Sequence, residues 1–441
     1  MLKKVLAIIL ALIMCLSLAA CGSDSNTENE GTAKEEGSEE KTEETDKTGE
    51  DGTASYNGYE PERFDTDELT WEFDAASGTL SIHGQGPMRD YSKEAPEWEQ
   101  HKDDILIITL DDGITSVGAY AFYNYLALTD VVLPDSVEVI DVSAFDYSWA
   151  LQSITIPASL KYVGERAFYN TLIWTPENLV FPEGCEYIGD CAFHSALKSG
   201  GYVSLPASLK YLGKMAFTNA FISDITVAEG NETYVSDNHA VFTKDKKEML
   251  MLAPDIEDSD EYLIPDGVEK IYSECFNLIQ SIETVYIPAS VKEIEEGALF
   301  STFNLKEIVV DEANANYKSE NGILLSKDGT LLLAWPDGIE GKELVIPDGV
   351  KRIGEYLFYG RYDEGYSVVI PEGVEEIGTF SLPGFMASVT LPSSLKKIDN
   401  SVFYDGISIN SISYNGTKAD WDKVSIGEEN EALDSLNIQM K

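Results

Sequence analysis

Residues 151–168 read Leu-Gln-Ser-Ile-Thr-Ile-Pro-Ala-Ser-Leu-Lys-Tyr-Val-Gly-Glu-Arg-Ala-Phe. Polar and apolar residues alternate from Ser153 to Ile156, which predicts a strand with one buried face. Pro157 has no N–H for a sheet and favours a turn, so it marks the corner where the strand ends. A second short apolar piece follows, and the pair Ala167-Phe168 then offers a small side chain for a crowded position and a large one for the core. The stretch predicts two short strands, a corner and one helical turn.

The same unit recurs along the chain at a nearly constant interval. Its first apolar position falls at Ile114, Val137, Leu160, Cys185, Leu209, Val268, Val291, Val350, Val374 and Leu395. Successive units are 21–25 residues apart, except for two intervals of 59 residues. A period of this size is typical of repeat proteins, in which each unit buries its apolar face against its neighbours. The sequence therefore predicts a β-rich solenoid of about ten coils over residues 113–411, with the Phe side chains aligned along one continuous axis.

The two long intervals contain extra segments that resemble each other. They lie at about 225–262 and 308–344, and each adds about 36 residues to a normal coil. Tyr234-Val235-Ser236 in the first segment corresponds to Tyr317-Lys318-Ser319 in the second. In both segments an apolar run and a polar Lys-Asp pair follow. The sequence predicts two related insertions of β type.

The two ends of the array differ in sequence from its repeats. Residues 61–112 contain the apolar stretches Leu69–Phe73, Gly78–Ile82 and Ile105–Ile108, which predict a β-rich N-terminal cap. Residues 412–441 depart from the repeat and are expected to form a C-terminal cap. Caps are needed because a terminal coil would otherwise expose its apolar face.

The first residues are typical of an exported protein. Lys3-Lys4 precede an apolar stretch from Val5 to Leu16, and the sequence then reads Leu18-Ala19-Ala20-Cys21, which predicts a signal peptide over residues 1–20. Twelve apolar residues are fewer than the roughly 20 that a spanning helix needs. The Leu-Ala-Ala-Cys ending resembles the lipobox of bacterial lipoproteins. This resemblance implies cleavage before Cys21, a lipid on its sulfur and contact with the membrane through this anchor only. An ordinary signal peptide followed by an incidental cysteine is the alternative.

Residues 21–60 are rich in Glu, Thr, Ser, Gly, Lys and Asp and contain almost no large apolar side chain. Such a segment cannot bury enough apolar surface to offset its conformational entropy. Its negative charges repel one another. The sequence therefore predicts an extended, disordered acidic linker between the lipidated cysteine and the folded body.

The composition excludes several classes of function. With 78 acidic and 31 basic residues, the chain has a formal net charge of −47, which argues against binding to nucleic acid. Four His and five Cys argue against a His/Cys metal centre, and no motif indicates a cofactor. None of the catalytic motifs with defined spacing is present, and His194-Ser195, as sequence neighbours, do not make a catalytic triad. The chain is expected to be non-catalytic, without metal or cofactor.

The cysteines of the folded body are expected to be core residues. Cys185 occupies the apolar position that Leu160 fills in the preceding unit, and Cys275 occupies the position of Ala167. Cys191 precedes an Ala-Phe pair and is expected to be partly exposed. An odd number of thiols argues against a disulfide framework, but a bridge between Cys185 and Cys191 remains an alternative.

Aromatic residues follow the Ala-Phe pair in three successive units. On stacked coils they would lie near one another along one edge, and Tyr and Trp are favoured in recognition sites and stack on sugar rings. The candidate ligand-binding edge consists of Tyr123, Tyr147, Trp149, Tyr169 and Trp174. Tyr125 falls in a position that is small in other units and is assigned to the core. The alternative is that several of these rings pack under the next coil.

The units Asp135-Ser136-Val137 to Ala144-Phe145 and Leu151 to Pro157 resemble the BspA-like class of bacterial leucine-rich repeats. The resemblance covers residues 69–441, with Leu in place of the Phe or Ala at Leu299, Leu382 and Leu357. It implies a surface-exposed binding or adhesion role without catalytic residues. We therefore expect a lipid-anchored protein on the outer face of the bacterial membrane that binds an extracellular protein of a host, a matrix or another cell surface. A carbohydrate-binding or carbohydrate-active protein that uses the aromatic edge and carboxylates is the alternative.

Overall fold

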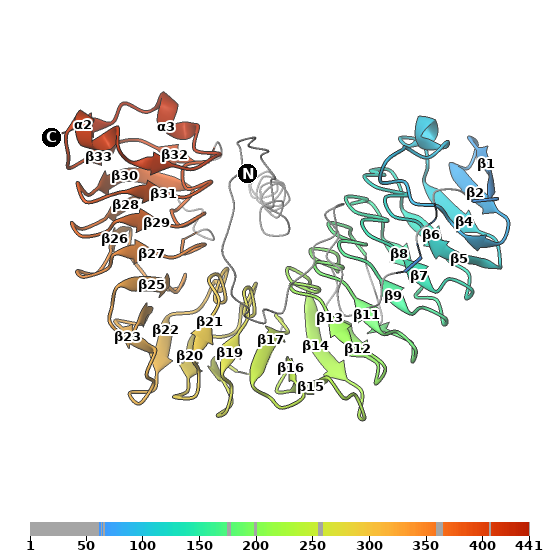
Figure 1. Ribbon diagram of the computed structural model, residues 1–441, viewed down its shortest axis with the longest axis horizontal. Helices are drawn as coiled ribbons and strands as arrows, with labels where there is room; N and C mark the ends of the chain where they lie inside the picture. The colour runs from blue at the N-terminus through green and yellow to red at the C-terminus, as the bar shows by residue number, and fades with distance from the viewer. Residues whose placement is uncertain are drawn as a thin grey trace, which may run out of the picture.

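The structure is a computed structural model that describes residues 61–62, 64, 67–173, 178–197, 201–254, 259–358, 365–404 and 407–440. The expected signal peptide, the expected lipid site Cys21, the linker and Trp174 lie outside these residues. The described part of the chain is a solenoid that curves into an open arc, with its first and last coils at the two tips (Figure 1).

The longer strands of successive coils form four parallel sheets that we call the long-strand ladder. Its members are β2 (Thr79–His83), β4 (Ile107–Leu110), β6 (Asp130–Val132), β8 (Ser153–Ile154), β10 (Leu179–Val180), β12 (Gly201–Leu205), β14 (Ile222–Val227), β18 (Glu261–Leu263), β20 (Thr284–Ile287), β22 (Glu307–Val310), β26 (Glu343–Val345), β28 (Tyr366–Val369), β30 (Phe385–Leu391), β33 (Ile412–Tyr414) and β35 (Gln439–Met440). Buried and exposed residues alternate along these strands, as the sequence pattern predicted.

The second strand of each coil is short and belongs to the short-strand ladder. Its members are β3 (Gly86–Pro87), β5 (Ile114–Val117), β7 (Val139–Ile140), β9 (Tyr162–Val163), β11 (Tyr187–Ile188), β13 (Tyr211–Leu212), β17 (Glu248–Leu252), β19 (Lys270–Ile271), β21 (Glu293–Ile294), β25 (Leu331–Ala334), β27 (Arg352–Ile353), β29 (Glu376–Ile377), β31 (Lys397–Ile398) and β34 (Ser425–Ile426). Pairing is interrupted between β13 and β17, which we call the first break, and between β21 and β25, the second break.

The short-strand ladder has fourteen strands within the described residues, so the solenoid has about fourteen turns instead of ten. Two additional turns come from the cap regions, where β3 and β34 join the ladder. The other two come from the insertions, because β17 and β25 pair in parallel with the strands that follow them. Each insertion is therefore a coil of its own plus a hairpin. The sequence hid these coils because they contain neither the Ala-Phe pair nor one of its near variants, such as Cys275-Phe276, which mark the ten predicted units.

The hairpins of the two insertions have the same topology. They are β15 (Tyr234–Asp237) with β16 (Ala240–Thr243), and β23 (Tyr317–Glu320) with β24 (Ile323–Ser326). In each, the second strand pairs antiparallel with the ladder strand of its own insertion, β17 or β25. The related sequences of the two segments thus fold into related structures.

Stacked phenylalanine rings fill the core of the first coils. Phe122, Phe145, Phe168, Phe193 and Phe217 lie one per coil, with successive ring centroids 4.9–5.4 Å apart. All five are buried. The same turns form a third set of contacts between coils, because the N–H of each of the first four Phe residues donates to the carbonyl oxygen of the Ala in the next coil at 2.8–2.9 Å.

The Ala-Phe segment is not a helical turn in detail. Arg166 and Asn170 both have φ of 54°, in the left-handed region, so the backbone makes two successive tight turns instead of continuing as a right-handed helix.

The glycine before the Ala-Phe segment is required by packing and not by its φ angle. Gly164 does not have a positive φ; a Cβ there would lie only 2.5 Å from the backbone nitrogen of Val142 in the preceding coil. Close approach of coils therefore requires this glycine.

The arc bends where the insertions lie. After β17 only eight residues (253–260) lead back to the long-strand ladder, whereas twelve (272–283) do so after β19. The two hairpins lie on the outer side of the arc (Figure 1). Each insertion is thus a wedge, wide outside and narrow inside. In agreement, the core is divided into three main clusters that meet at the insertions, so the expected continuous axis is interrupted there.

The ends of the array are closed by other elements. At the N-terminal end β1 (Thr70–Asp74) pairs antiparallel with β2, and the short 3-10 helix η1 (Glu99–His101) follows Trp98, whose ring stacks on Phe122. At the C-terminal end lie β32 (Ser408–Ile409), α2 (Lys418–Trp421) and α3 (Ala432–Ser435). In the part of the chain that the structure describes, no helix has the length and apolar character to cross a membrane.

Candidate functional site

Three of the predicted aromatic residues form a row across neighbouring coils. The ring centroids of Tyr123 and Tyr147 are 6.2 Å apart, and those of Tyr147 and Tyr169 are 5.8 Å apart, both edge to face. Tyr169 in turn stacks on His194 at 4.9 Å. Tyr123, Tyr169 and His194 directly follow the Phe of their coils, whereas Tyr147 lies two residues after Phe145. Two adjacent positions of the turn therefore contribute rings to the row.

The members of the candidate edge differ in exposure. Tyr123 is 38% exposed and Trp149 is 43% exposed, whereas Tyr147 is half-buried and Tyr169 is fully buried. A ligand could contact the first three, while Tyr169 supports the row from below. Tyr125 is fully buried, as predicted.

A buried ion pair lies beneath the row. The Nε of Arg166 is 2.9 Å from Oδ2 of Asp146, and both side chains are largely buried. The guanidinium also lies 3.8 Å from the ring centroid of Tyr169. Burial raises the pKa of Asp146 to about 6, although Arg166 opposes this shift. The pair joins the two tyrosine-bearing turns and is largely shielded from solvent.

His194 and Ser195 belong to a second buried cluster. Ser195 Oγ lies 3.1 Å from His194 Nδ1, Asn219 Nδ2 donates to the same hydroxyl at 2.5 Å, and Glu274 Oε2 is 4.0 Å from His194 Nε2. All of these side chains except that of Asn219 are buried. A serine and a carboxylate on opposite ring nitrogens have the composition of a triad, but this serine is buried. The cluster serves packing between coils on the inner side of the bend.

The structure settles the two open questions about cysteines. Cys185 is a free thiol, so no disulfide joins it to Cys191. Burial raises the pKa of the Cys185 thiol to about 12, which makes it unreactive. Cys191 is fully buried and not partly exposed as expected.

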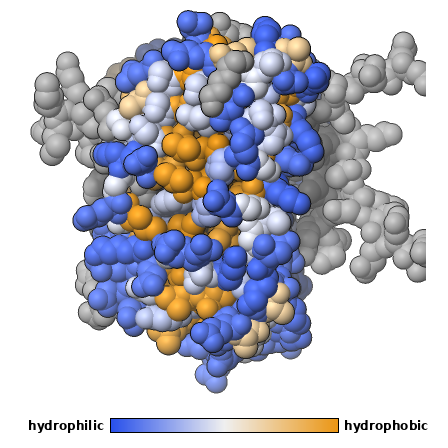
Figure 2. All heavy atoms as spheres, turned by 90° about the vertical axis from the view of Figure 1, so that its left-hand side faces the viewer, coloured by the Kyte–Doolittle hydropathy of each residue, from blue (hydrophilic) through white to orange (hydrophobic). Residues whose placement is uncertain are grey.

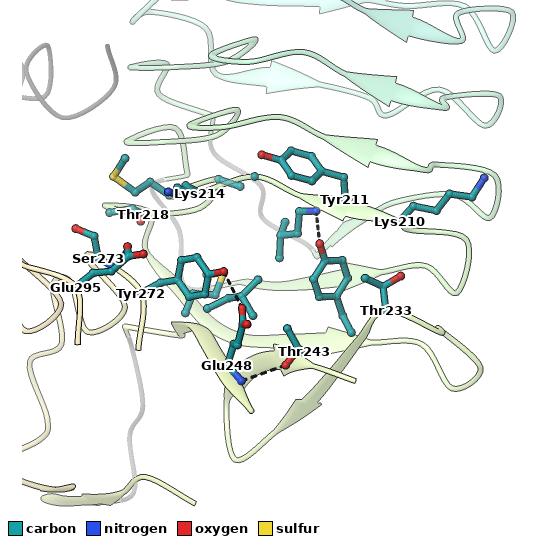
Figure 3. Close-up of a pocket in the computed structure, with 17 residues that line it drawn as sticks. Lys210, Tyr211, Lys214, Thr218, Thr233, Thr243, Glu248, Tyr272, Ser273 and Glu295 are labelled. Carbon is teal, nitrogen blue, oxygen red and sulfur yellow. Dashed lines mark hydrogen bonds between the residues drawn. The ribbon is translucent and has the colours of Figure 1, made fainter. Parts of the chain in front are cut away.

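The first break contains a pocket that the sequence did not predict (Figure 3). Its volume is about 340 Å³, and it lies between the coil of β13 on one side and β17 and β19 on the other. Leu212, Ala216, Leu250 and Met251 give it an apolar floor. Around them stand the polar side chains Lys210, Tyr211, Lys214, Thr218, Thr233, Tyr234, Thr243, Glu248, Tyr272, Ser273 and Glu295.

One asparagine holds the hairpin beside this pocket in place. Asn231 Nδ2 donates to the carbonyl oxygens of Pro206 (3.0 Å) and Leu209 (2.9 Å), and its Oδ1 accepts from the N–H groups of Thr233 (2.8 Å) and Tyr234 (2.7 Å). The buried amide thus forms all four hydrogen bonds that its NH₂ group and its carbonyl oxygen can make.

The same arrangement recurs at the second break. Asn314 Nδ2 donates to the carbonyl oxygens of Pro288 (2.9 Å) and Val291 (3.0 Å), and its Oδ1 accepts from Asn316 (2.9 Å) and Tyr317 (2.8 Å). The shared pattern Asn-x-x-Tyr in both insertions was the signal in the sequence that could have identified these residues.

A different surface feature lies on the C-terminal limb. An apolar band runs along this limb between hydrophilic margins (Figure 2). In the sheet of β26, β28 and β30, the outward residues Val345 and Val369 are register partners, and Val345 is exposed.

Within the described residues, no group of three or more His, Cys, Asp or Glu side chains could hold a metal ion.

Comparison with known proteins identifies the repeat. The sequence matches the family described as "BspA type Leucine rich repeat region", in six copies, over residues 115–247, 257–321 and 338–438. A search among curated proteins found no match.

Solved structures of low sequence identity are also similar. A leucine rich cell surface protein from Faecalibacterium prausnitzii A2-165 is 20% identical, with 83% of this chain and 98% of that chain covered and a TM-score of 0.44. A leucine-rich repeat protein from Bacteroides ovatus ATCC 8483 is 20% identical, with 86% and 99% covered and a TM-score of 0.40. The pneumococcal vaccine antigen PcpA is 17% identical, with 86% and 87% covered and a TM-score of 0.33.

Proposed function

The chain belongs to the BspA-type leucine-rich repeat family, and from this premise we propose that it is a lipid-anchored bacterial cell-surface protein that binds other extracellular proteins. The lipobox-like sequence before Cys21 supports the anchor. A lipid chain contributes about 0.8 kcal/mol for each buried methylene group, so two or three chains hold a protein at a membrane without a spanning helix. The acidic linker would then carry the arc away from the membrane.

The observation that carries the binding proposal is the exposed part of the aromatic row. Tyr123 presents its ring at the end of the row, where it contacts the half-buried Tyr147, which in turn contacts the buried Tyr169. Trp149 presents a second exposed ring on the adjacent coil. Rigid aromatic side chains bury much area at little entropic cost and dominate the energetics of protein interfaces. The remaining surface is strongly acidic, so it favours partners with a complementary basic patch.

The lipid anchor can be tested by substitution of its attachment site. Cells producing the Cys21→Ser variant should release the protein into the medium, while the wild type should partition into the detergent phase of a Triton X-114 extraction. Retention of the variant in the membrane fraction would contradict the proposed anchor.

Protein binding can be tested with the released full chain on an array of immobilised matrix proteins and cell-surface ectodomains. Substitution of both Tyr123 and Trp149 by Ala should weaken binding to any captured protein at least tenfold. Tyr202→Ala is the matched control, because Tyr202 is an aromatic residue of similar exposure (44%) on β12. Equal loss with the control variant would show that the aromatic row is not the binding edge.

A carbohydrate-binding role is the second candidate, and the exposed indole of Trp149 favours it because indole rings stack on sugars. A glycan array and a hydrolysis screen distinguish the two. Glycan binding that is lost in Trp149→Ala, without binding to any protein on the first array, would support the carbohydrate role and contradict the protein-binding proposal. Trp174→Ala should be included in the same series.

A further inference from the structure

The main chain at the first break has an unpaired edge. At regular steps each coil bonds to the next; for example, the Gly213 N–H donates to the Ile188 carbonyl oxygen at 2.8 Å. On its other side the coil of β13 has no such neighbour, because β13 pairs only with β11. The carbonyl groups of Lys210 and Leu212 and the N–H of Met215 form no hydrogen bond within the described residues. All three residues line the pocket.

The hairpin covers this edge at one point. The hydroxyl of Tyr234 accepts a hydrogen bond from the Leu212 N–H at 2.9 Å, which takes the place of the missing strand for that donor. The residues that carry the remaining groups line the same pocket as the side chains of Glu248 and Tyr272 (Figure 3). An exposed edge with unpaired groups is a template for an added strand.

At the second break, side chains bridge the corresponding gap. There the Ile294 N–H donates to the Tyr317 hydroxyl at 2.9 Å, as at the first break. Glu296, however, reaches across the gap, where one carboxylate oxygen accepts from the Glu355 N–H at 2.8 Å and the other bonds the guanidinium of Arg352. The cavity beside it measures only about 10 Å³.

Sequence differences explain why the first break stays open. Lys214 stands where Glu296 stands at the second break, and Lys270 stands in place of Arg352. A lysine at both positions cannot form the bridge, because two cations repel each other. Lys270 instead pairs with Glu293 and Glu295, at 2.8 Å each. Lys214 is exposed and forms no ion pair within the described residues.

We propose that the first break is a docking site for an extended peptide segment of a partner protein, which adds as a strand to the edge at Lys210–Met215. The inference rests on the proposed protein-binding function and assigns a second site to it. The peptide N–H groups would donate to the two free carbonyl groups, which are two residues apart, as in a parallel ladder. A side chain of the peptide would enter the pocket, whose apolar floor fits an aliphatic or aromatic residue. An acidic residue beside it would meet Lys214 in an otherwise acidic molecule.

The main-chain groups favour a peptide over a glycan as the occupant. A peptide supplies donors at the same spacing as the unpaired acceptors, since both are strands. A sugar has no such repeat along this edge.

The test selects peptides from a phage-displayed library of random dodecamers against the full chain carrying Cys21→Ser, and measures the binding of selected peptides by fluorescence anisotropy. Each peptide is then made with single N-methyl groups along its chain. We expect N-methylation at two alternate positions to weaken binding at least tenfold and N-methylation between them to have little effect. Uniform tolerance of N-methylation would overturn the proposal.

A second experiment uses a variant in which the pocket is closed. The triple variant Lys214→Glu, Lys270→Arg and Tyr272→Gly copies the second break and should reduce peptide binding at least tenfold, while Lys244→Glu, a matched change of charge at an exposed site, should not. Circular dichroism and thermal unfolding verify that both variants fold. If the triple variant does not fold, the N-methyl series decides alone.

The outcomes separate this inference from the proposed function. Failure to select any peptide, or binding that survives closure of the pocket, would overturn the docking site, and so would a glycan that occupies it. If proteins on the array still bind through Tyr123 and Trp149 in those cases, the proposed function stands. If no protein binds in any assay, both proposals fail.

Discussion

The two insertions of this protein have nearly the same architecture and different interiors. Both add one coil and one hairpin, and both use an Asn-x-x-Tyr pair to attach that hairpin to the coil before it. One break is bridged by an ion pair beside a cavity of about 10 Å³, whereas the other has no such bridge within the described residues and contains a pocket of about 340 Å³. The backbone of each insertion creates a gap in the short-strand ladder, and a few side chains decide whether that gap becomes a pocket.

The largest loss of stability is expected when the asparagine that attaches each hairpin is replaced. Asn231→Ala and Asn314→Ala each leave two carbonyl groups and two N–H groups without their partner in a buried position, so each should lower the free energy of unfolding by about 4 kcal/mol. Urea unfolding followed by circular dichroism, with hydrogen exchange to locate the opened coils, measures this loss.

The exposed Asn410→Ala is the control for this pair and should cause no measurable loss. If only one of the two buried asparagines mattered, the structural equivalence of the insertions would be refuted.

The second expected effect is a dependence of stability on pH, which arises after the first break and not at the corresponding position after the second break. The left-handed turn position after the first break holds the buried Glu274, and the corresponding position after the second break holds Tyr356. Burial raises the pKa of Glu274 to about 7, compared with 4.5 for the free side chain. The folded state therefore holds a proton that the unfolded state has lost between these pH values, and stability falls as pH rises from about 4.5 to 7.

Glu274→Gln should remove this loss of stability. Above pH 7 we expect the variant to be more stable than the wild type by roughly 3 kcal/mol, and below pH 4.5 we expect no difference. His194, 4.0 Å from this carboxylate, is retained in both proteins. Thermal unfolding between pH 4 and 8 measures the effect, and parallel curves for the two proteins would contradict it.

The third expected effect concerns the bridge itself. Glu296→Ala removes a half-buried ion pair and a bond to the main chain at the second break, and should destabilise the protein by about 1.5 kcal/mol. Lys214→Ala, at the corresponding position of the first break, should change stability by less than about 0.5 kcal/mol because an exposed lysine makes no such bridge. Chemical denaturation of both variants under identical conditions tests the contrast, which would fail if their losses were equal.

The smallest expected effect concerns the tyrosine hydroxyls that replace a missing strand. Tyr234→Phe and Tyr317→Phe each remove one acceptor from a main-chain N–H, and each should cost about 0.7 kcal/mol. Hydrogen exchange at Leu212 and Ile294 should accelerate in the matching variant only. Unchanged exchange at both amides would show that these hydroxyls do not protect the broken edges.

Much of the fold was predictable because each coil repeats a local pattern. The alternation around Ile154 and Ile156, the corner at Pro157 and the stacked Phe168 each depend on residues within one coil and on its identical neighbours. Two strands escaped prediction. β17 and β25 carry apolar residues without the Ala-Phe pair, so their coils looked like insertions outside the array.

The candidate site was only partly predictable. The positions of Tyr123, Tyr147 and Tyr169 after the Phe placed them in one row, but the burial of Tyr169 depends on how Arg166 and His194 pack around its ring. The pocket could not be found from local patterns, because it lies between residues up to 85 positions apart, from Lys210 to Glu295.

The amino-acid sequence by itself determined the repeat, its period and its Phe core, because burial in a solenoid depends on side chains that recur in every coil. Tertiary structure decided what happens where the recurrence stops. At each insertion a missing turn on the inner side and a hairpin on the outer side bend the stack, and the main chain of one coil loses its neighbour. Whether that edge is bridged, as by Glu296 and Arg352, or left beside a pocket depends on distances between coils, which no single repeat encodes.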